Sequence, residues 1–196
     1  YFFNMKMDSS NVLLNSLYKY YENENNMNKL ISVLKDGNNV SLRIIDWFVT
    51  NFSKKHNICY NLYRTENKKI TFNEKGNEIH KVFNTYHAYK SQLKSYSKKR
   101  FDPFCRRERI SFTCKNGNMI ETTIGQLNFF KWAIDNLILD FIEENYDEIE
   151  LDMNSSYNNI KKQKKNSKER KKRQELSKSA SRGLNSNNYK VVLSFN

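Results

Sequence analysis

Two apolar segments with helical periodicity constrain the fold of this chain more than any other feature. In segment 42–55 the apolar residues are Leu42, Ile45, Trp47, Phe48, Val49 and Phe52. In segment 124–145 they are Ile124, Leu127, Phe130, Trp132, Ile134, Leu137, Ile138, Phe141 and Ile142. A helix that is apolar around most of its circumference has to be buried. Each segment follows a suitable N-cap, Ser41 for the first and Thr122 or Thr123 for the second. We therefore predict that these two helices form the centre of a core.

Shorter segments predict the elements that surround these helices. Amphipathic patterns at 8–21 and 27–34 indicate two further helices, and a third covers about 80–100. Segment 58–74 alternates and contains a turn-like stretch, which predicts a β-hairpin. A second hairpin is expected around Asn116-Gly117, since this dipeptide favours a tight two-residue turn. Together these patterns predict an α+β fold with about five helices and two short β-hairpins.

The composition changes near residue 153. The formal net charge of the 196 residues is +13. Residues 160–196 contain twelve Lys or Arg and two acids, a net +10, while residues 1–159 carry only +3. This basic stretch has too few apolar groups to offset the entropy lost on ordering. We therefore predict a single globular domain over 1–152 and a basic, largely disordered C-terminal tail over 153–196.

The segment 90–109, which we call the basic segment, is the strongest functional candidate. Eight of its twenty residues are Lys or Arg, and interspersed apolar groups such as Leu93 and Phe101 can anchor it to a core. A basic segment tied to a fold favours a polyanion as its partner. An alternative is a solvated charged face that is partly neutralised by the acids of 143–152. The candidate nucleic-acid-binding residues are Lys90, Lys94, Lys98, Lys99, Arg100, Arg106, Arg107 and Arg109.

Within the basic segment, Lys90, Lys94 and Lys98 recur at helical spacing, and Asp102-Pro103 ends the predicted helix. The aromatic side chains of this region can stack on bases or pack in the core, and their helical spacing favours the core. These aromatic residues are Tyr86, Tyr89, Phe101 and Phe104.

The tail contains a second group of candidate nucleic-acid-binding residues. A run of this kind binds any polyanion and also resembles a nuclear-import signal. Its low specificity indicates that it supplies affinity rather than recognition. The residues are Lys161, Lys162, Lys164, Lys165, Arg170, Lys171, Lys172 and Arg173.

The sequence predicts no metal site, no cofactor and no catalytic centre. Cys59, Cys105 and Cys114 do not form the paired spacing with each other or with the histidines that a metal site needs. Buried cysteines on strands are therefore the favoured interpretation, and the odd number of widely spaced cysteines indicates a reducing compartment. A Cys105–His87 nucleophile pair lacks support, phosphate-binding glycine motifs are absent, and the acids of 143–152 are expected to be solvated. No apolar run approaches the length of a membrane span. We therefore expect a non-enzymatic protein, the alternative being a metal-dependent nuclease.

Three stretches resemble a protein family shared among nucleocytoplasmic large DNA viruses, the giant viruses. They read VSLRIIDWFVTN (40–51), YKSQLKSYSKKRFDPFCRRERI (89–110) and TTIGQLNFFKWAI (122–134). The resemblance covers about residues 40–150 and implies no reaction. It implies a virus factory in the host cytoplasm, or a virion, as the setting.

These observations predict a protein that binds nucleic acid, DNA rather than RNA, through backbone contacts. Other viral proteins are further expected partners, and the basic tail also allows a nuclear location. The alternative function is that of a virion structural or interaction protein whose basic tail contacts an acidic protein or a membrane surface.

Overall fold

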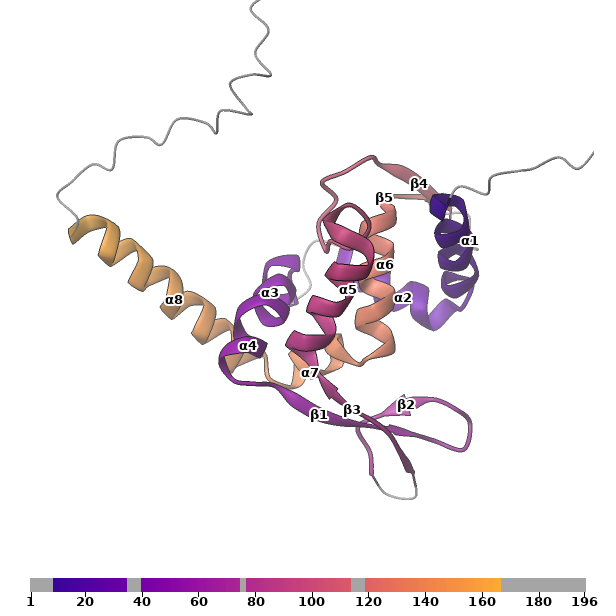
Figure 1. The fold of residues 1–196 in the computed structure, drawn as a ribbon, viewed down its shortest axis with the longest axis horizontal. Coiled ribbons are helices and arrows are strands. Elements are labelled where there is room, and N and C mark those ends of the chain that lie inside the picture. Colours follow the sequence, from indigo (N-terminus) through magenta and orange to yellow (C-terminus); the bar gives the residue numbers. More distant parts are fainter. Residues whose placement is uncertain (1–8, 35–39, 75–76, 114–118, 167–196) are drawn as a thin grey trace, which may run out of the picture. The chain divides into compact units, whose positions relative to one another are not determined.

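The structure, a computed structural model, describes residues 9–34, 40–74, 77–113 and 119–166, with side chains from residue 12 to residue 158. It has the predicted α+β fold, in which two small antiparallel sheets flank a core of helices (Figure 1). The chain divides into two units, Tyr1–Ser156 and Tyr157–Asn196. Helix α8 spans Tyr146–Asn166, so the predicted start of the tail at residue 153 falls inside a helix.

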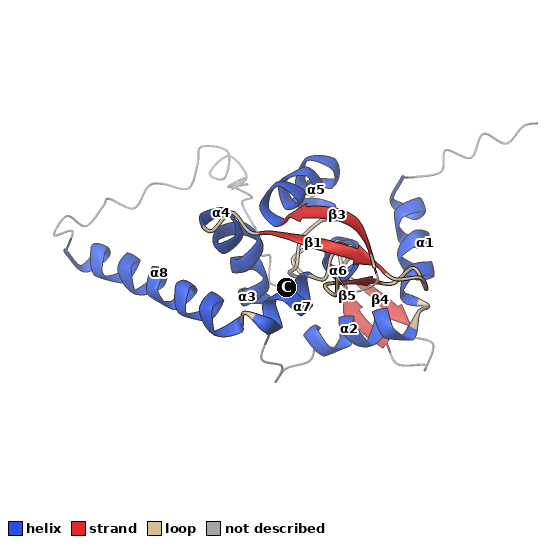
Figure 2. Ribbon diagram, turned by 90° about the horizontal axis from the view of Figure 1, so that it is seen from below, coloured by secondary structure: helices blue, strands red, loops and turns tan. Residues whose placement is uncertain are grey.

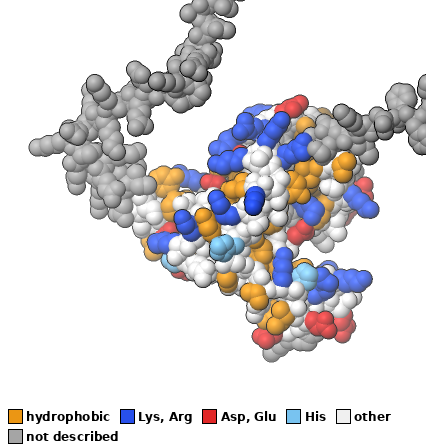
Figure 3. Space-filling model, viewed as in Figure 1, with side chains coloured by type: hydrophobic (Ala, Val, Ile, Leu, Met, Phe, Trp, Pro, Cys, Tyr) orange, Lys and Arg blue, Asp and Glu red, His pale blue; other side chains and the backbone are white. Residues whose placement is uncertain are grey.

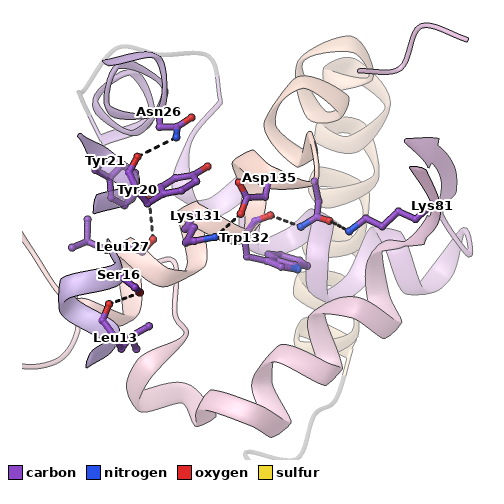
Figure 4. Close-up of polar contacts among 11 residues, drawn as sticks. Leu13, Ser16, Tyr20, Tyr21, Asn26, Lys81, Leu127, Lys131, Trp132 and Asp135 are labelled. Carbon is purple, nitrogen blue, oxygen red and sulfur yellow. Dashed lines mark hydrogen bonds and ion pairs between the residues drawn. The ribbon is translucent and has the colours of Figure 1, made fainter. Parts of the chain in front are cut away.

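Helix α6 (Ile124–Asp135) forms the centre of the core, as its apolar composition predicts. Thr123 is its N-cap, and the side-chain oxygen of Thr123 accepts a hydrogen bond from the backbone N–H of Gln126. Helix α5 (Thr85–Arg100) packs against one side of α6, while α1 (Ser9–Tyr21) and α2 (Glu24–Leu34) contact another side (Figure 1). The hydroxyl of Tyr21 donates to the backbone oxygen of Leu127 at 2.8 Å, which ties α1 to α6 (Figure 4).

The predicted helix 124–145 is interrupted after α6. Helix α7 (Ile138–Glu144) begins after a break at Asn136 and Leu137. The side-chain amide of Asn136 donates to the backbone oxygen of Trp132 at 2.6 Å, and Leu137 adopts a left-handed conformation with φ 54°. An Asn side chain that bonds to the backbone competes with the helical hydrogen bonds, which explains why the helix ends here.

The predicted helix 42–55 is continuous but not uniform. It consists of α3 (Leu42–Trp47), the π-helical turn η1 (Phe48–Phe52) and α4 (Ser53–Lys55). Ser41 is the N-cap, since its hydroxyl accepts a hydrogen bond from the N–H of Ile44 at 3.3 Å. The wider η1 turn carries Phe48, Val49 and Phe52, all buried in the core. The segment is therefore a core helix, as predicted.

Both predicted hairpins are present, and the first gains a third strand. Strands β1 (Cys59–Arg64), β2 (Ile70–Thr71) and β3 (Glu78–Asn84) pair antiparallel in the order β2-β1-β3. The prediction of a helix from about residue 80 was wrong, because residues 78–84 pair with β1 and α5 starts only at Thr85. The side-chain oxygen of Asn84 accepts a hydrogen bond from the N–H of His87 and caps α5.

The second hairpin consists of β4 (Ile110–Thr113) and β5 (Met119–Thr122). Its turn at Asn116-Gly117 lies outside the described residues. Figure 1 shows this hairpin beside α1 and far from the β1–β3 sheet, which lies beside α5 (Figure 2). The ring of Phe112 in β4 stacks on Tyr18 of α1 with 4.6 Å between the ring centroids. This contact joins the second hairpin to the helical part of the core.

Candidate nucleic-acid interface

The basic segment consists of the C-terminal part of α5 and the loop that leads into β4. Lys and Arg side chains gather on the surface over α5 and this loop (Figure 3). All the candidate cations of the segment are exposed except Arg100, which is half-buried. The structure therefore places the predicted residues on one stretch of surface.

Three hydrogen bonds fix the loop after α5 to the start of α6. The backbone N–H of Asp102 donates to the oxygen of Gly125 at 3.2 Å. The side-chain amide of Gln126 donates to the oxygen of Pro103 at 2.8 Å, and that of Asn128 donates to the oxygen of Arg100 at 2.9 Å. Because Gln126 and Asn128 are buried, these bonds are protected from water. The cations on this loop thus have a defined position.

Gly125 allows this close approach between the loop and α6. A Cβ atom at position 125 would lie 3.2 Å from the backbone oxygen of Lys99 and 3.4 Å from the backbone nitrogen of Phe101. Both neighbours are backbone atoms, so a larger residue would push the loop away from α6. The glycine therefore contributes to the shape of the basic segment.

The cations of the basic segment fall into two classes according to their partners. Arg106 donates to both carboxylate oxygens of the buried Asp102, from Nε at 3.1 Å and from Nη2 at 3.0 Å. Arg109 forms a salt bridge with Glu121 of β5. Within the part of the chain that the structure describes, the remaining exposed cations form no salt bridge, and we call them the unpaired cations: Lys90, Lys94, Lys98, Lys99 and Arg107.

The lysine spacing is less regular than the sequence predicts. Ser97 interrupts the helical geometry of α5 with φ 57° and ψ 168°. Lys90 and Lys94 therefore lie one turn apart on a regular helix, whereas Lys98 follows the kink. The Ser97 hydroxyl accepts a hydrogen bond from the N–H of Lys99 at 3.3 Å, which caps the short final turn.

The aromatic side chains of the segment belong mainly to the core. Tyr89 and Phe101 are buried, and both rings contact Trp132 of α6. Phe104 is half-buried, with the guanidinium of Arg106 4.6 Å from its ring centroid. Core packing rather than base stacking therefore accounts for Tyr89 and Phe101.

Two acids lie close to the Arg106 end of the segment. Burial raises the pKa of the Asp46 carboxyl, an effect that the charges of Arg106 and Lys98 oppose. Burial, together with Asp46 and Asp102, raises the pKa of Tyr89 to about 12, so this hydroxyl stays neutral near pH 7. The positive charge of the segment is consequently weakest near Arg106.

Asp152, one of the acids of 143–152, has partners on other elements of the fold. Asp152 accepts hydrogen bonds from Trp47 Nε1, at 3.0 Å, and from Lys55 Nζ. Burial alone would raise the pKa of Asp152, but these bonds outweigh it and lower the pKa. Among the described residues, no salt bridge joins the acids of 143–152 to the basic segment. Direct pairing with this acidic stretch therefore does not neutralise the unpaired cations.

The cysteines differ from the sequence-based expectation. Cys59 lies on β1 but is exposed, and Cys105 is half-buried in the loop before β4 rather than on a strand. Cys114 lies outside the described residues. No group of three His, Cys, Asp or Glu side chains that could hold a metal ion occurs in the described part.

The tail candidates are not placed by the structure. Helix α8 includes Lys161, Lys162, Lys164 and Lys165, whose side chains lie outside the described range. The second group, at 170–173, lies beyond the last described residue. No described helix is long and apolar enough to cross a membrane.

The structure also assembles a basic group that the sequence did not predict. Arg64, Lys68, Lys69 and Lys81 line one cavity although they come from β1, the β1–β2 turn and β3. Their separation along the chain hides them from any search for charge runs. Only the pairing of β1 with β2 and β3 brings them together.

The model of a protein family of unknown function, DUF7197, matches residues 3–196. The chain belongs to this family. It is also 37% identical over 143 residues to Uncharacterized protein L507 of Acanthamoeba polyphaga mimivirus. That match covers 70% of this chain but 51% of the relative, so the chain spans about half of the relative's length. No solved structure is significantly similar to the chain. The resemblance to a giant-virus family is thereby confirmed, and the mimivirus relative supports a viral origin.

Proposed function

We propose that this protein is a non-enzymatic nucleic-acid-binding protein that holds DNA by its phosphate backbone through the basic segment. The observation that carries the proposal is the group of five unpaired cations on a helix and loop that are anchored to α6. A cation without an acidic partner is available to neutralise a phosphate and release its counterion. The basic tail adds affinity without a defined shape.

The chemistry of the segment favours backbone contacts over base readout. Lys90 and Lys94 lie about 6 Å apart along the axis of α5, roughly two nucleotide rises along one DNA strand. Two of its aromatic rings, Tyr89 and Phe101, are buried in the core and unavailable to stack on bases. DNA is the expected partner because of the resemblance to large DNA viruses. We place the activity in a virus factory of the host cytoplasm or in the virion.

Fluorescence anisotropy with a labelled DNA duplex tests the proposal on the full chain. We expect Lys90→Glu/Lys94→Glu to weaken binding at least tenfold at low salt, since two phosphate contacts are lost and two repulsions appear. Lys19→Glu, at an exposed position on α1, is the control for charge reversal and should have a much smaller effect. Circular dichroism verifies that the variants fold. If both variants weaken DNA binding only slightly and to the same extent, the tail alone accounts for binding, and the proposed role of the basic segment is refuted.

A second candidate function, an interaction protein of the virion, is favoured by exposed apolar side chains. Ile79 and Val82 on β3 are 64% and 69% exposed, and Leu151 on α8 is 68% exposed. Exposed apolar groups of this size are typical of contact surfaces between proteins when they form a patch. The purified protein distinguishes the two functions, because a DNA-binding protein retains nucleic acid at low salt and has a raised ratio of absorbance at 260 and 280 nm.

A further inference from the structure

A cavity of about 880 Å³ lies between the β1–β3 sheet and the helices α2 and α6. The β1–β2 turn and β3 form one wall, and α2 with the α6–α7 junction forms the other. Figure 3 shows the surface hollowed between the β-sheet lobe and the helical part above it. Sites for small ligands in proteins measure about 300–1,000 Å³, so the cleft can hold a ligand the size of a nucleotide.

The sheet wall of the cleft is strongly positive. Arg64, Lys68, Lys69 and Lys81 line it, and none of them forms a salt bridge within the described ranges. Lys81 is exposed, and its ammonium donates to the side-chain oxygen of the buried Asn136 at 2.6 Å (Figure 4). Burial lowers the pKa of Lys81, although Asp135 opposes this shift. An ammonium that is bonded to a neutral amide rather than to a carboxylate keeps its charge available for an anionic ligand.

The acids near the cleft do not cancel this charge. Asp135, which lines the cleft, is bonded to Lys131 at 2.6 Å (Figure 4). The cleft residue Lys29 is in turn paired with Asp140. The acidic residues of the sheet lobe lie outside the cleft lining: Glu66, Glu74 and Glu78. In Figure 3 the basic side chains of this lobe occupy its edge toward the hollow, and the acidic ones gather at the opposite edge.

The helical wall supplies neutral hydrogen-bonding groups and a small apolar floor. Asn25 and Asn28 present exposed side-chain amides, which can donate to and accept from a base or a sugar. Ile70, Ile134 and Leu137 add apolar surface between the walls. One wall thus suits phosphate groups, while the other suits the polar edges of a nucleoside.

We propose that this cleft binds the phosphate groups of a nucleoside phosphate, either a free nucleotide or the terminal nucleotide of a nucleic-acid strand. Arg64 and the lysines of the β1–β2 turn contact the phosphates, and Lys81 contacts them from β3. The asparagines of α2 contact the nucleoside. The cleft uses residues that the basic segment does not contain, so this site and the DNA-binding surface are independent.

Calorimetric titration of the full chain with ATP, and separately with a short single-stranded oligonucleotide that carries a 5′-phosphate, tests the proposal. The cleft variant is Lys68→Asn/Lys69→Gln. Asn suits position 68 because Lys68 has φ 59°, a left-handed conformation that Asn tolerates well. The matched control, Lys19→Gln/Lys54→Gln, removes the same charge at exposed positions outside both the cleft and the basic segment. A second cleft variant, Arg64→Gln, excludes an effect of the turn conformation alone.

We expect ATP to bind the wild type and to bind the cleft variants about tenfold or more weakly, since each lost charge-assisted hydrogen bond costs about that factor. The control should bind ATP like the wild type. If only the phosphorylated oligonucleotide responds to the cleft variants, the ligand is the end of a strand. If neither ligand distinguishes the cleft variants from the wild type, the cleft proposal is wrong, and that result leaves the proposed DNA-binding role of the basic segment unaffected.

Discussion

The salt bridge between Arg109 and Glu121 offers a gain-of-affinity test of the proposed interface. Both side chains are exposed, at 63% and 60%, so this pair contributes little to stability. Glu121→Gln removes the competing carboxylate and frees the Arg109 guanidinium for a phosphate. A loss of affinity is the common result of mutation, so an increase is the more discriminating outcome.

The expected magnitude follows from counterion release. Each neutralised phosphate contributes about 0.9 to the slope of log affinity against log salt. The five unpaired cations together account for a slope of about 4.5, in addition to the contribution of the tail. Freeing Arg109 should steepen the slope by about 0.9 and raise the affinity roughly eightfold at 0.1 M salt.

The assay is fluorescence anisotropy of a labelled duplex between 50 and 200 mM salt. Glu22→Gln, at an exposed position just after α1, removes the same charge away from the interface and should leave the slope unchanged. If Glu121→Gln and Glu22→Gln have the same slope as the wild type, Arg109 does not approach a phosphate. The assignment of Arg109 to the interface would then be refuted.

Three further predictions concern stability. Asp102→Ala should lower the free energy of unfolding by about 2 kcal/mol, because Arg106 loses its acceptor, and an unchanged urea midpoint would contradict this. Trp132→Ala should cost about 3–5 kcal/mol, since the ring packs on Phe101 and other core rings; a cost below 1 kcal/mol would argue against this packing. Burial raises the pKa of the Asp46 carboxyl in the folded state above its value in the unfolded chain. At a pH above this raised pKa, the ionised carboxyl lowers the free energy of unfolding. This destabilisation disappears as the pH falls through the folded-state pKa. Asp46→Asn should therefore be more stable than the wild type near pH 7 but not at acidic pH, as thermal melts across pH can verify.

Much of the fold could be predicted because its core helices have a strong local signal. The apolar residues of 42–55 and 124–145 are dense enough to require burial in any arrangement. Strand β3 was missed because its signal is not local. Of its residues only Phe83 is buried, and its strand conformation comes from pairing with β1. The break at Asn136 and the kink at Ser97 also depend on side-chain contacts that periodicity does not encode.

The candidate interface could be predicted in part for the same reason. The run of lysines and arginines can be read from the sequence, and its helical spacing followed by Asp102-Pro103 predicts that it is exposed on a helix and a loop. Which cations are neutralised is not visible, because Glu121 reaches Arg109 from the neighbouring strand. The cations of the cleft escaped detection altogether, since the sheet assembles them from separate segments.

The most direct test of the account is an NMR titration of the ¹⁵N-labelled full chain with a short DNA duplex. If the basic segment holds the backbone, the largest amide shift changes should fall in 90–109, with smaller changes at the start of α6, to which this loop is bonded. Changes confined to residues 157–196, with 90–109 unaffected, would contradict the central claim that a shaped surface of this fold binds nucleic acid.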